Sequence, residues 1–350
     1  MLLITLQDLR FRLRQFLIAI CGAGLVFALS LLLTGLAHGF TVEIDQTVNG
    51  MGASSWVVAD GAAGRVAELP VIPQSLAHSV ASDHGVIRAD PVLIVPQTAS
   101  VSRGDERSLI LVGTTPGSVV RSRASVGRTL ASRGEAIVDT SLGLGIGRSF
   151  AVSGVGFRVV GTVSDRTLLG GTAVAYVSLA DAQAAVFGGR PLVNAILTTG
   201  SPSSVPKGLA VLSNAQIKSA SLAQMLSAVS SINNSRLFSW IIAAVIVAAL
   251  VYVTALERNR DFAVLKALGA SSRLLFLGLA LQAVLVALAA AVLASIIANF
   301  MTGLFVQPVD IPPSAFGLLP LSAVVVGLVA SLAALRRAIA VDPAMAFAGV

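Results

Sequence analysis

Four long apolar stretches constrain this chain more than any other feature. They cover residues 16–36, 237–256, 274–300 and 314–335, and none contains Asp, Glu, Lys or Arg. A helix needs about 20 apolar residues to cross the hydrocarbon core of a bilayer. We therefore predict four membrane-spanning helices. The residues after position 36 make a poor small-residue cleavage site, so the first stretch is interpreted as an uncleaved helix and not as a signal peptide.

The composition supports a membrane protein. Only 12% of the 350 residues are charged and 55% are hydrophobic, whereas soluble domains carry about 25% charged residues. The net charge of +7 does not indicate nucleic-acid binding, because only 5% of residues are aromatic and the basic residues of the short segments lie beside the apolar stretches. The single cysteine, Cys21, excludes an internal disulfide and a Cys-based metal site.

Basic residues also predict the orientation, because short loops rich in Lys and Arg stay in the cytoplasm. The loop 301–313 holds Asp310 and no Lys or Arg. We therefore expect both termini and the loop 257–273 inside, and residues 37–236 outside. The basic residues in the short segments next to the spans are Arg10, Arg12, Arg14, Arg258, Arg260, Lys266, Arg273, Arg336 and Arg337.

The remaining segments complete the predicted organisation. Residues 1–15 are expected to form a cytoplasmic amphipathic helix, 301–313 an external loop and 336–350 a cytoplasmic tail. The segment 37–236 alternates β-like runs with helical patches, which indicates a large α+β domain. The β-like runs are 55–58, 92–95, 109–112 and 157–163, and the helical patches are 178–187 and 221–231.

No catalytic or nucleotide motif emerges from the residues. Gly143, Gly145 and Gly147 do not fit G-x-G-x-x-G, because the third glycine comes too early and a strand-like run follows. They are interpreted as turn glycines, and the sequence contains no G-x-x-x-x-G-K-[ST]. We therefore expect a non-catalytic chain with no cofactor of its own.

Two groups of titratable side chains remain. His84 lies near Asp83 and Asp90, and Glu43 lies near Asp45. We interpret the first group as solvated surface and not as a metal site. We interpret the two carboxylates as the solvated start of the external domain and not as an acid/base pair.

The loop 257–273 has a pattern too regular for a simple tether. Phe262, Leu265 and Leu268 recur at three-residue spacing, which predicts an apolar stripe on a short helix. Gly269 suits the position after a helix end, and Ser271 suits the cap of the next helix. Such a helix lies either on the membrane surface or in the groove of a cytoplasmic partner. The residues by themselves leave both interpretations open.

A family resemblance favours the second interpretation. The loop reads E-R-x-R-D-F-x-x-L-K-A-L-G-A from Glu257 to Ala270. It resembles the loop after the second membrane helix of the MacB/FtsX/LolCE family of ABC transporter permeases, E-R-x-x-E-[IF]-x-x-[LM]-[KR]-A-[IL]-G-A, with Asp261 in place of Glu. Residues 134–139, 161–163, 175–182 and 336–346 also resemble this family, so that the resemblance covers essentially the whole chain.

The resemblance implies a type VII, mechanotransmission permease of the bacterial plasma membrane, a four-helix half without a fused ATPase. ATP and Mg would bind to a separate cytoplasmic ATPase subunit, and a second permease copy, identical or not, would complete the transporter within the lipid membrane. The loop would form a coupling helix that docks on the ATPase. Its expected contact residues are Glu257, Arg258, Arg260, Asp261, Phe262, Leu265, Lys266, Ala267, Leu268 and Gly269.

The expected function is to convert ATP hydrolysis into movement of the external domain, for export or extraction of a substrate. One alternative is an FtsX-like signalling subunit that controls a cell-wall hydrolase. Another is an amino-acid importer, but Gln282 and Asn299 are the only strongly polar side chains in the spans, which argues against a hydrophilic path. Small residues such as Gly22, Gly24, Ala244 and Ala248 would allow close helix packing.

Overall fold

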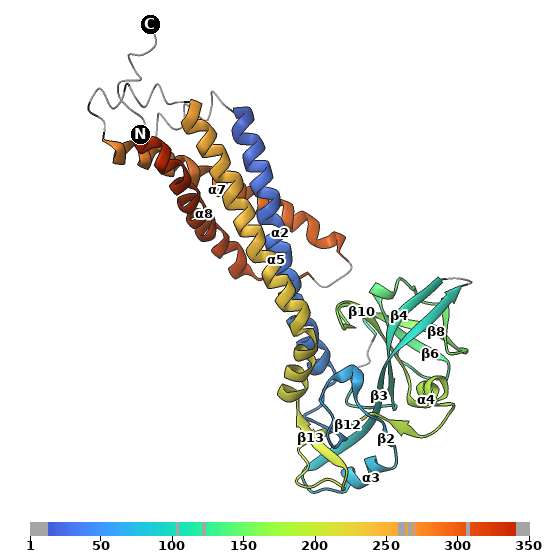
Figure 1. The fold of residues 1–350 in the computed structure, drawn as a ribbon. Coiled ribbons are helices and arrows are strands. Elements are labelled where there is room, and N and C mark those ends of the chain that lie inside the picture. The colour runs from blue at the N-terminus through green and yellow to red at the C-terminus, as the bar shows by residue number, and fades with distance from the viewer. Residues whose placement is uncertain are drawn as a thin grey trace. The chain divides into compact units, whose positions relative to one another are not determined.

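The computed structural model describes residues 13–102, 105–120, 124–257, 264, 269, 271–305 and 309–340. They form two compact units. One is helical and comprises the chain up to His38, Ala228–Phe305 and the segment from Val309 on. The other is the external domain, Gly39–Ser227. Figure 1 shows the helices of the first unit and the strand-rich second unit.

Four helices are long and apolar enough to cross a membrane, as predicted. Of the predicted helix over 1–15, residues 13–15 begin the first long helix and the rest lie outside the described residues, as do 341–350 of the predicted tail. The four helices are α2 (Leu13–Gly50), α5 (Asn214–Glu257), α7 (Ser272–Met301) and α8 (Pro313–Ala340).

Small residues allow the helical unit to pack closely. Ala283, Ala287 and Ala290 of α7 are fully buried at helical spacing. A Cβ atom at Gly327 of α8 would lie 2.8 Å from the Cα atom of Val284, so the two backbones are in contact. Figure 1 shows α7 and α8 side by side. As in other membrane bundles, close backbone approach takes the place of large interlocking side chains.

The predicted small positions serve this packing within the chain. A Cβ atom at Gly24 would lie 3.0 Å from Leu293 of α7, and one at Gly22 would lie 3.8 Å from Ile246 of α5. Two polar contacts join α2 to α5: the indole N–H of Trp240 donates to Ser30 at 2.7 Å, and the guanidinium of Arg236 donates to Thr34 at 3.3 Å.

The loop between α7 and α8 packs on α2. It begins with the 3-10 turn η3 (Thr302–Leu304). The backbone N–H of Asp310 donates to the carbonyl of Gly35 at 3.1 Å, and the Asp310 carboxylate lies 3.7 Å from the His38 imidazole. Gly35 has no room for a side chain, because a Cβ atom there would lie 2.6 Å from Ile311.

The external domain is a mixed α/β structure built on one large sheet, which confirms the predicted α+β class. Its strands are β1 (Ser55–Ala59), β2 (Ile72–Pro73), β3 (Val86–Ser102), β4 (Asp105–Thr114), β5 (Val126–Gly127), β6 (Glu135–Asp139), β7 (Ser149–Val152), β8 (Val155–Val163), β9 (Thr167–Leu168), β10 (Thr172–Ser178), β11 (Leu192–Val193), β12 (Ala195–Gly200) and β13 (Leu209–Ser213); its short helices are η1 (Val66–Glu68), α3 (Leu76–Ala81), η2 (Thr140–Leu142) and α4 (Leu179–Phe187).

The strand pairings close into a ring. The order β3-β4-β10-β6-β8 continues through β7, which pairs with both β8 and β3. Strands β4 and β10 are parallel, as are β6 and β8. The long strand β3 also pairs with β12, which carries β1 and β13 (Figure 1).

Both faces of the central strands are buried. Along β4, Leu109 and Leu111 join one apolar cluster, whereas Ile110 and Val112 join another. Successive side chains of a strand point to opposite faces, so the continuous apolar run at 109–112 is typical of a strand covered on both sides. The stacked rings of Phe150 and Phe157, 5.4 Å apart, belong to the first cluster.

Most predicted local elements are present, but two helices extend further than predicted. The four β-like runs lie in β1, β3, β4 and β8, and the patch 178–187 corresponds to α4. The patch 221–231 is part of α5, which begins at Asn214, and α2 continues from the first span to Gly50. Both extensions carry many polar residues, and hydropathy did not reveal them.

Candidate functional site

The predicted coupling loop is only partly within the described residues. Glu257 ends α5, and its carboxylate accepts a hydrogen bond from the Gln15 side chain at 3.4 Å. The Ser271 hydroxyl accepts from the Leu274 N–H at the start of α7, as predicted. Gly269 has a positive φ of 91°, which suits the predicted position after a helix end. Val264, within the predicted stripe segment, is helical and exposed. The predicted contact residues Arg258, Arg260, Asp261, Phe262, Leu265, Lys266, Ala267 and Leu268 lie outside the described residues.

A second cluster ties the end of α2 to the external domain. Glu43 is 5% exposed, and its two carboxylate oxygens accept hydrogen bonds from the backbone N–H groups of Gly170 and Gly171 at 2.9 and 2.8 Å. These glycines follow Leu169 in the turn between β9 and β10, and all three residues have positive φ. Successive backbone N–H groups in such a turn form a concave anion-binding nest, and Glu43 occupies it.

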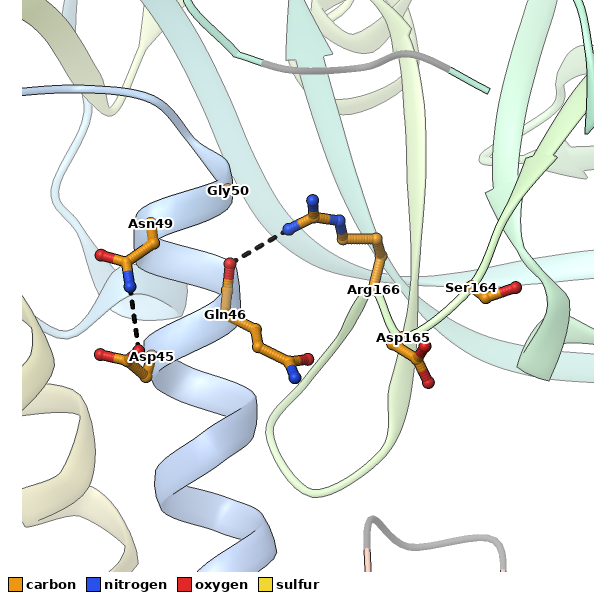
Figure 2. Close-up of a pocket in the computed structure, with 7 residues that line it drawn as sticks. All are labelled: Asp45, Gln46, Asn49, Gly50, Ser164, Asp165 and Arg166. Carbon is orange, nitrogen blue, oxygen red and sulfur yellow. Dashed lines mark hydrogen bonds between the residues drawn. The ribbon is translucent and has the colours of Figure 1, made fainter. Parts of the chain in front are cut away.

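Two further contacts hold the same hairpin one turn along α2. The hydroxyl of Thr47 donates to the carbonyl of Thr167 at 2.8 Å. The guanidinium of Arg166 donates to the carbonyl of Gln46 at 3.1 Å, the contact drawn in Figure 2. Arg166 lies so close to α2 that a Cβ atom at Gly50 would be 2.0 Å from its Nη1 atom. Gly50 therefore makes room for the guanidinium.

The end of α2 is also tied to the first turns of α5. The Asp45 carboxylate forms an ion pair with Lys218 of α5 and accepts a hydrogen bond from the Asn49 amide at 2.9 Å (Figure 2). We call the contacts of Glu43, Asp45, Thr47, Arg166 and Lys218 the helix clasp.

The turns of α2 that form the helix clasp also contribute to an apolar cluster. Ile44 and Val48 of α2 are one helical turn apart, and both pack in a cluster with Leu168 of β9 and Ile217 of α5. All four side chains are at most 4% exposed. Because one cluster holds residues of both helices and of the sheet, α2 and α5 enter the core of the domain and do not merely tether it.

The helix clasp corrects one interpretation from the sequence. Glu43 was expected to be solvated, but it is buried and accepts two hydrogen bonds. Its partners lie 127 and 128 residues further along the chain, so no local pattern could have revealed them. The only local signal was the unusual run of polar side chains that continues a membrane helix.

A polar cavity lies between the helix clasp and the turn after β8. Its volume is about 460 Å³. Figure 2 shows Gln46 directed from α2 toward the turn that carries Asp165, a residue with a φ of 58°. The cavity is lined by Asp45, Gln46, Asn49, Gly50, Ser164, Asp165 and Arg166.

The two carboxylates near His84 have structural partners. Asp83 accepts hydrogen bonds from Gly85, Ser203 and Ser204, and the backbone bond from Ser203 is the largest cause of its lowered pKa. Asp90 was expected on the solvated surface, but it is buried and pairs with Arg88 at 2.8 Å. Within the described ranges, no group of three His, Cys, Asp or Glu side chains could hold a metal ion.

The glycine-rich segment is a turn, as predicted. Gly143 ends η2 with a φ of 70°, and Gly147 has a φ of 87° just before β7 begins at Ser149. No helix follows the glycines, so the strand-turn-helix geometry of a dinucleotide loop is absent from this described segment.

Comparisons with known proteins cover the whole chain. An ABC transporter permease of Mycobacterium tuberculosis and one of Mycobacterium bovis are each 39% identical over 350 residues, covering 100% of both chains. A second permease of Mycobacterium tuberculosis is 36% identical over the same length. The family FtsX-like permease C-terminal matches residues 236–343, which include α7, α8 and the predicted coupling loop.

Two solved structures are similar to part of the chain. The periplasmic region of MacB from Actinobacillus actinomycetemcomitans matches with a TM-score of 0.37 and 15% identity, covering 50% of this chain and 96% of that one. The extracellular domain of YknZ, an ABC-type transporter from Gram-positive bacteria, matches with a TM-score of 0.34 and 12% identity, covering 45% and 99%.

The relatives match from end to end, and the family match falls on the segment that carries the E-R-x-R-D-F loop and the last two long helices. These findings agree with a multi-pass membrane protein that has a large domain between its first two spans. The chain belongs to the FtsX-like family of ABC transporter permeases.

Proposed function

We propose that this permease couples ATP hydrolysis on a separate ATPase subunit to movement of its external domain, for export or extraction of a substrate. An ABC transporter permease works with a cytoplasmic ATPase, and the loop 257–273 is the proposed docking segment. In this proposal ATP and Mg bind to the partner, and the permease itself is non-catalytic.

The observation that carries the proposal is the helix clasp. Helices α2 and α5 each contribute residues both to the helical unit and to the external domain. At 1.5 Å per residue, they are about 57 and about 66 Å long, against about 30 Å of hydrocarbon. Helix α5 contains neither Gly nor Pro, the residues at which helices usually kink.

The contacts at the domain end suit the transmission of force. Glu43 holds two consecutive N–H groups of one hairpin, and Ile44 and Val48 anchor the same turns of α2 in the core of the domain. A displacement of α2 would therefore carry the β9–β10 hairpin with it. A flexible linker would absorb such a displacement.

Orientation and assembly complete the proposal. The basic residues beside the spans favour cytoplasmic termini, which would put the loop 257–273 on the side of the ATPase. A second permease copy would complete the transporter in the lipid membrane. In the helical unit, exposed apolar side chains such as Ile18, Val245 and Leu321 are available for lipid or for that copy.

The proposal is tested by reconstituting the permease with its ATPase and measuring ATP hydrolysis and binding of the two subunits. Phe262→Ala should abolish most of the stimulation of the ATPase. Val264→Ala is the matched control, because Val264 is exposed on the same segment and is not a predicted contact residue. It should leave the stimulation unchanged.

Three results would contradict the proposal. The first is full stimulation by the Phe262→Ala variant. The second is a purified permease that binds no ATPase. The third is amino-acid uptake, or activation of a cell-wall hydrolase by this subunit without any transport, because either would favour an alternative function.

A further inference from the structure

We propose that a cavity between β5, β6 and β8 of the external domain binds a small amphiphile with an anionic head group. Its volume is about 460 Å³. It shares no lining residue with the polar cavity of the helix clasp. Its lining residues are Gly127, Arg128, Glu135, Ile146, Gly147, Arg158, Val159 and Val160.

The cavity carries one free positive charge. The Arg158 side chain is exposed and makes no hydrogen bond or ion pair with any residue that the structure describes. A guanidinium has five N–H donors and no acceptor, and its planar fork fits carboxylate and phosphate groups. An anionic head group is therefore the natural partner for Arg158.

The other two charged side chains of the cavity neutralise each other. Glu135 accepts from both terminal nitrogens of Arg128, at 2.8 and 2.5 Å. It also accepts from the backbone N–H groups of Ala131 and Ser132, at 2.8 and 3.1 Å. Arg158 lies opposite Glu135 in the pairing of β6 with β8. Because the Glu135 carboxylate already accepts four hydrogen bonds, it has little capacity to accept another from Arg158. The net charge of the cavity is +1.

The rest of the lining is apolar or lacks side chains. Val159 and Val160 are buried, and Gly127 and Gly147 expose only backbone. Ile146 is 50% exposed and lines the cavity. Single exposed apolar residues are ordinary, but Ile146 lines the same cavity as Arg158. This combination fits a ligand with an apolar body and an anionic head.

The described Arg residues of the neighbouring segment 117–134 are paired and do not compete for this anion. Arg128 pairs with Glu135, and Arg133 pairs with Asp181. The role of such an amphiphile as cargo rests on the proposed function, whereas its binding does not.

The test uses the full-length permease in nanodiscs of neutral phosphatidylcholine, without ATPase. Binding of hexyl phosphate is measured by calorimetry and compared with hexanol, which lacks the charge, and with inorganic phosphate, which lacks the apolar body. Empty nanodiscs correct for partitioning into lipid. Hexyl phosphate should bind saturably, and at least about tenfold more tightly than either fragment.

Variants locate the site. Arg158→Ala should weaken hexyl phosphate binding about tenfold or more, and Ile146→Asn should weaken hexyl phosphate but not inorganic phosphate. Arg148→Ala is the matched control: the Arg148 side chain is exposed, makes no hydrogen bond or ion pair with the described residues and does not line the cavity. Thermal unfolding verifies that each variant is folded.

Four results would overturn the inference: no saturable binding, equal binding by Arg158→Ala, equal binding of hexanol, and equal binding of inorganic phosphate. The last would indicate a simple anion site. Because the ATPase is absent from this experiment, a failure here leaves the proposed coupling intact. Conversely, loss of ATPase stimulation in other variants would leave this cavity unaffected.

Discussion

The carboxylate of Glu43 accepts a hydrogen bond from the backbone N–H of Gly170, 127 residues away in the chain. The same carboxylate accepts a hydrogen bond from the backbone N–H of Gly171. One side chain of α2 therefore satisfies both of these N–H groups in the turn between β9 and β10. A buried carboxylate with two donors is a strong, directional contact. It fixes the hairpin to the helix at a defined register.

Replacing Glu43 should therefore weaken the external domain. Glu43→Ala leaves two part-buried N–H groups without their acceptor, and we expect the free energy of unfolding to fall by about 1–3 kcal/mol. Urea unfolding followed by the fluorescence of buried Trp56 measures this change. Gln46→Ala is the control, because the exposed Gln46 side chain makes no hydrogen bond within the described residues. A change below about 1 kcal/mol for Glu43→Ala would contradict the importance of this contact.

The ion pair of the helix clasp should contribute much less. The Asp45 and Lys218 side chains are 53% and 25% exposed, and pairs of this kind are worth about 0–1 kcal/mol. A double-mutant cycle with Asp45→Asn and Lys218→Met should give a coupling energy below about 1 kcal/mol that falls further in high salt. A salt-independent coupling above about 2 kcal/mol would show that this pair, like Glu43, is a buried anchor.

Glu43 and Asp45, two residues apart on α2, show what hydropathy does and does not predict. The four spans follow directly from runs of apolar residues, because each span is a local property. The extension of α2 from the first span to Gly50 passes through Glu43, Asp45 and Asn49, and there the apolar signal ends. What keeps that segment helical is packing of Ile44 and Val48 against distant strands.

The sheet shows the same limit. The run 109–112 predicts a buried strand, but its pairing with β3 on one side and with β10 on the other depends on contacts across the domain. In the loop before α7, by contrast, Gly269 and Ser271 were predicted from local rules, and both have the expected geometry. Local chemistry predicts caps and turns, whereas long-range pairing determines the external domain and the helix clasp.

Close helix packing in the membrane unit gives a third prediction. A methyl group at Gly327 would lie 2.8 Å from the Val284 backbone, whereas one at Gly278 meets nothing within 4 Å. Gly327→Ala should destabilise the contact of α7 with α8 by about 1–3 kcal/mol, and Gly278→Ala should be neutral or stabilising by up to about 1 kcal/mol. Thermal unfolding in detergent compares the two variants. Equal melting temperatures would show that the helices separate easily enough to accommodate the methyl group.

The Arg128–Glu135 pair gives a prediction about pH. Hydrogen bonds from Arg128, above all, and from Ala131 lower the pKa of Glu135 from 4.5 to about 2. Because the pKa is lower in the folded state, the stabilisation is complete above about pH 4.5 and is lost as the pH falls toward 2. At pH 7 the variant Glu135→Gln should unfold at a lower temperature than the native protein, and the difference should shrink steadily between about pH 4.5 and 2. Glu106→Gln is the control, since Glu106 is exposed and makes no side-chain contact in the described residues. A difference that stays constant with pH would mean that the Glu135 carboxylate is not held by these donors.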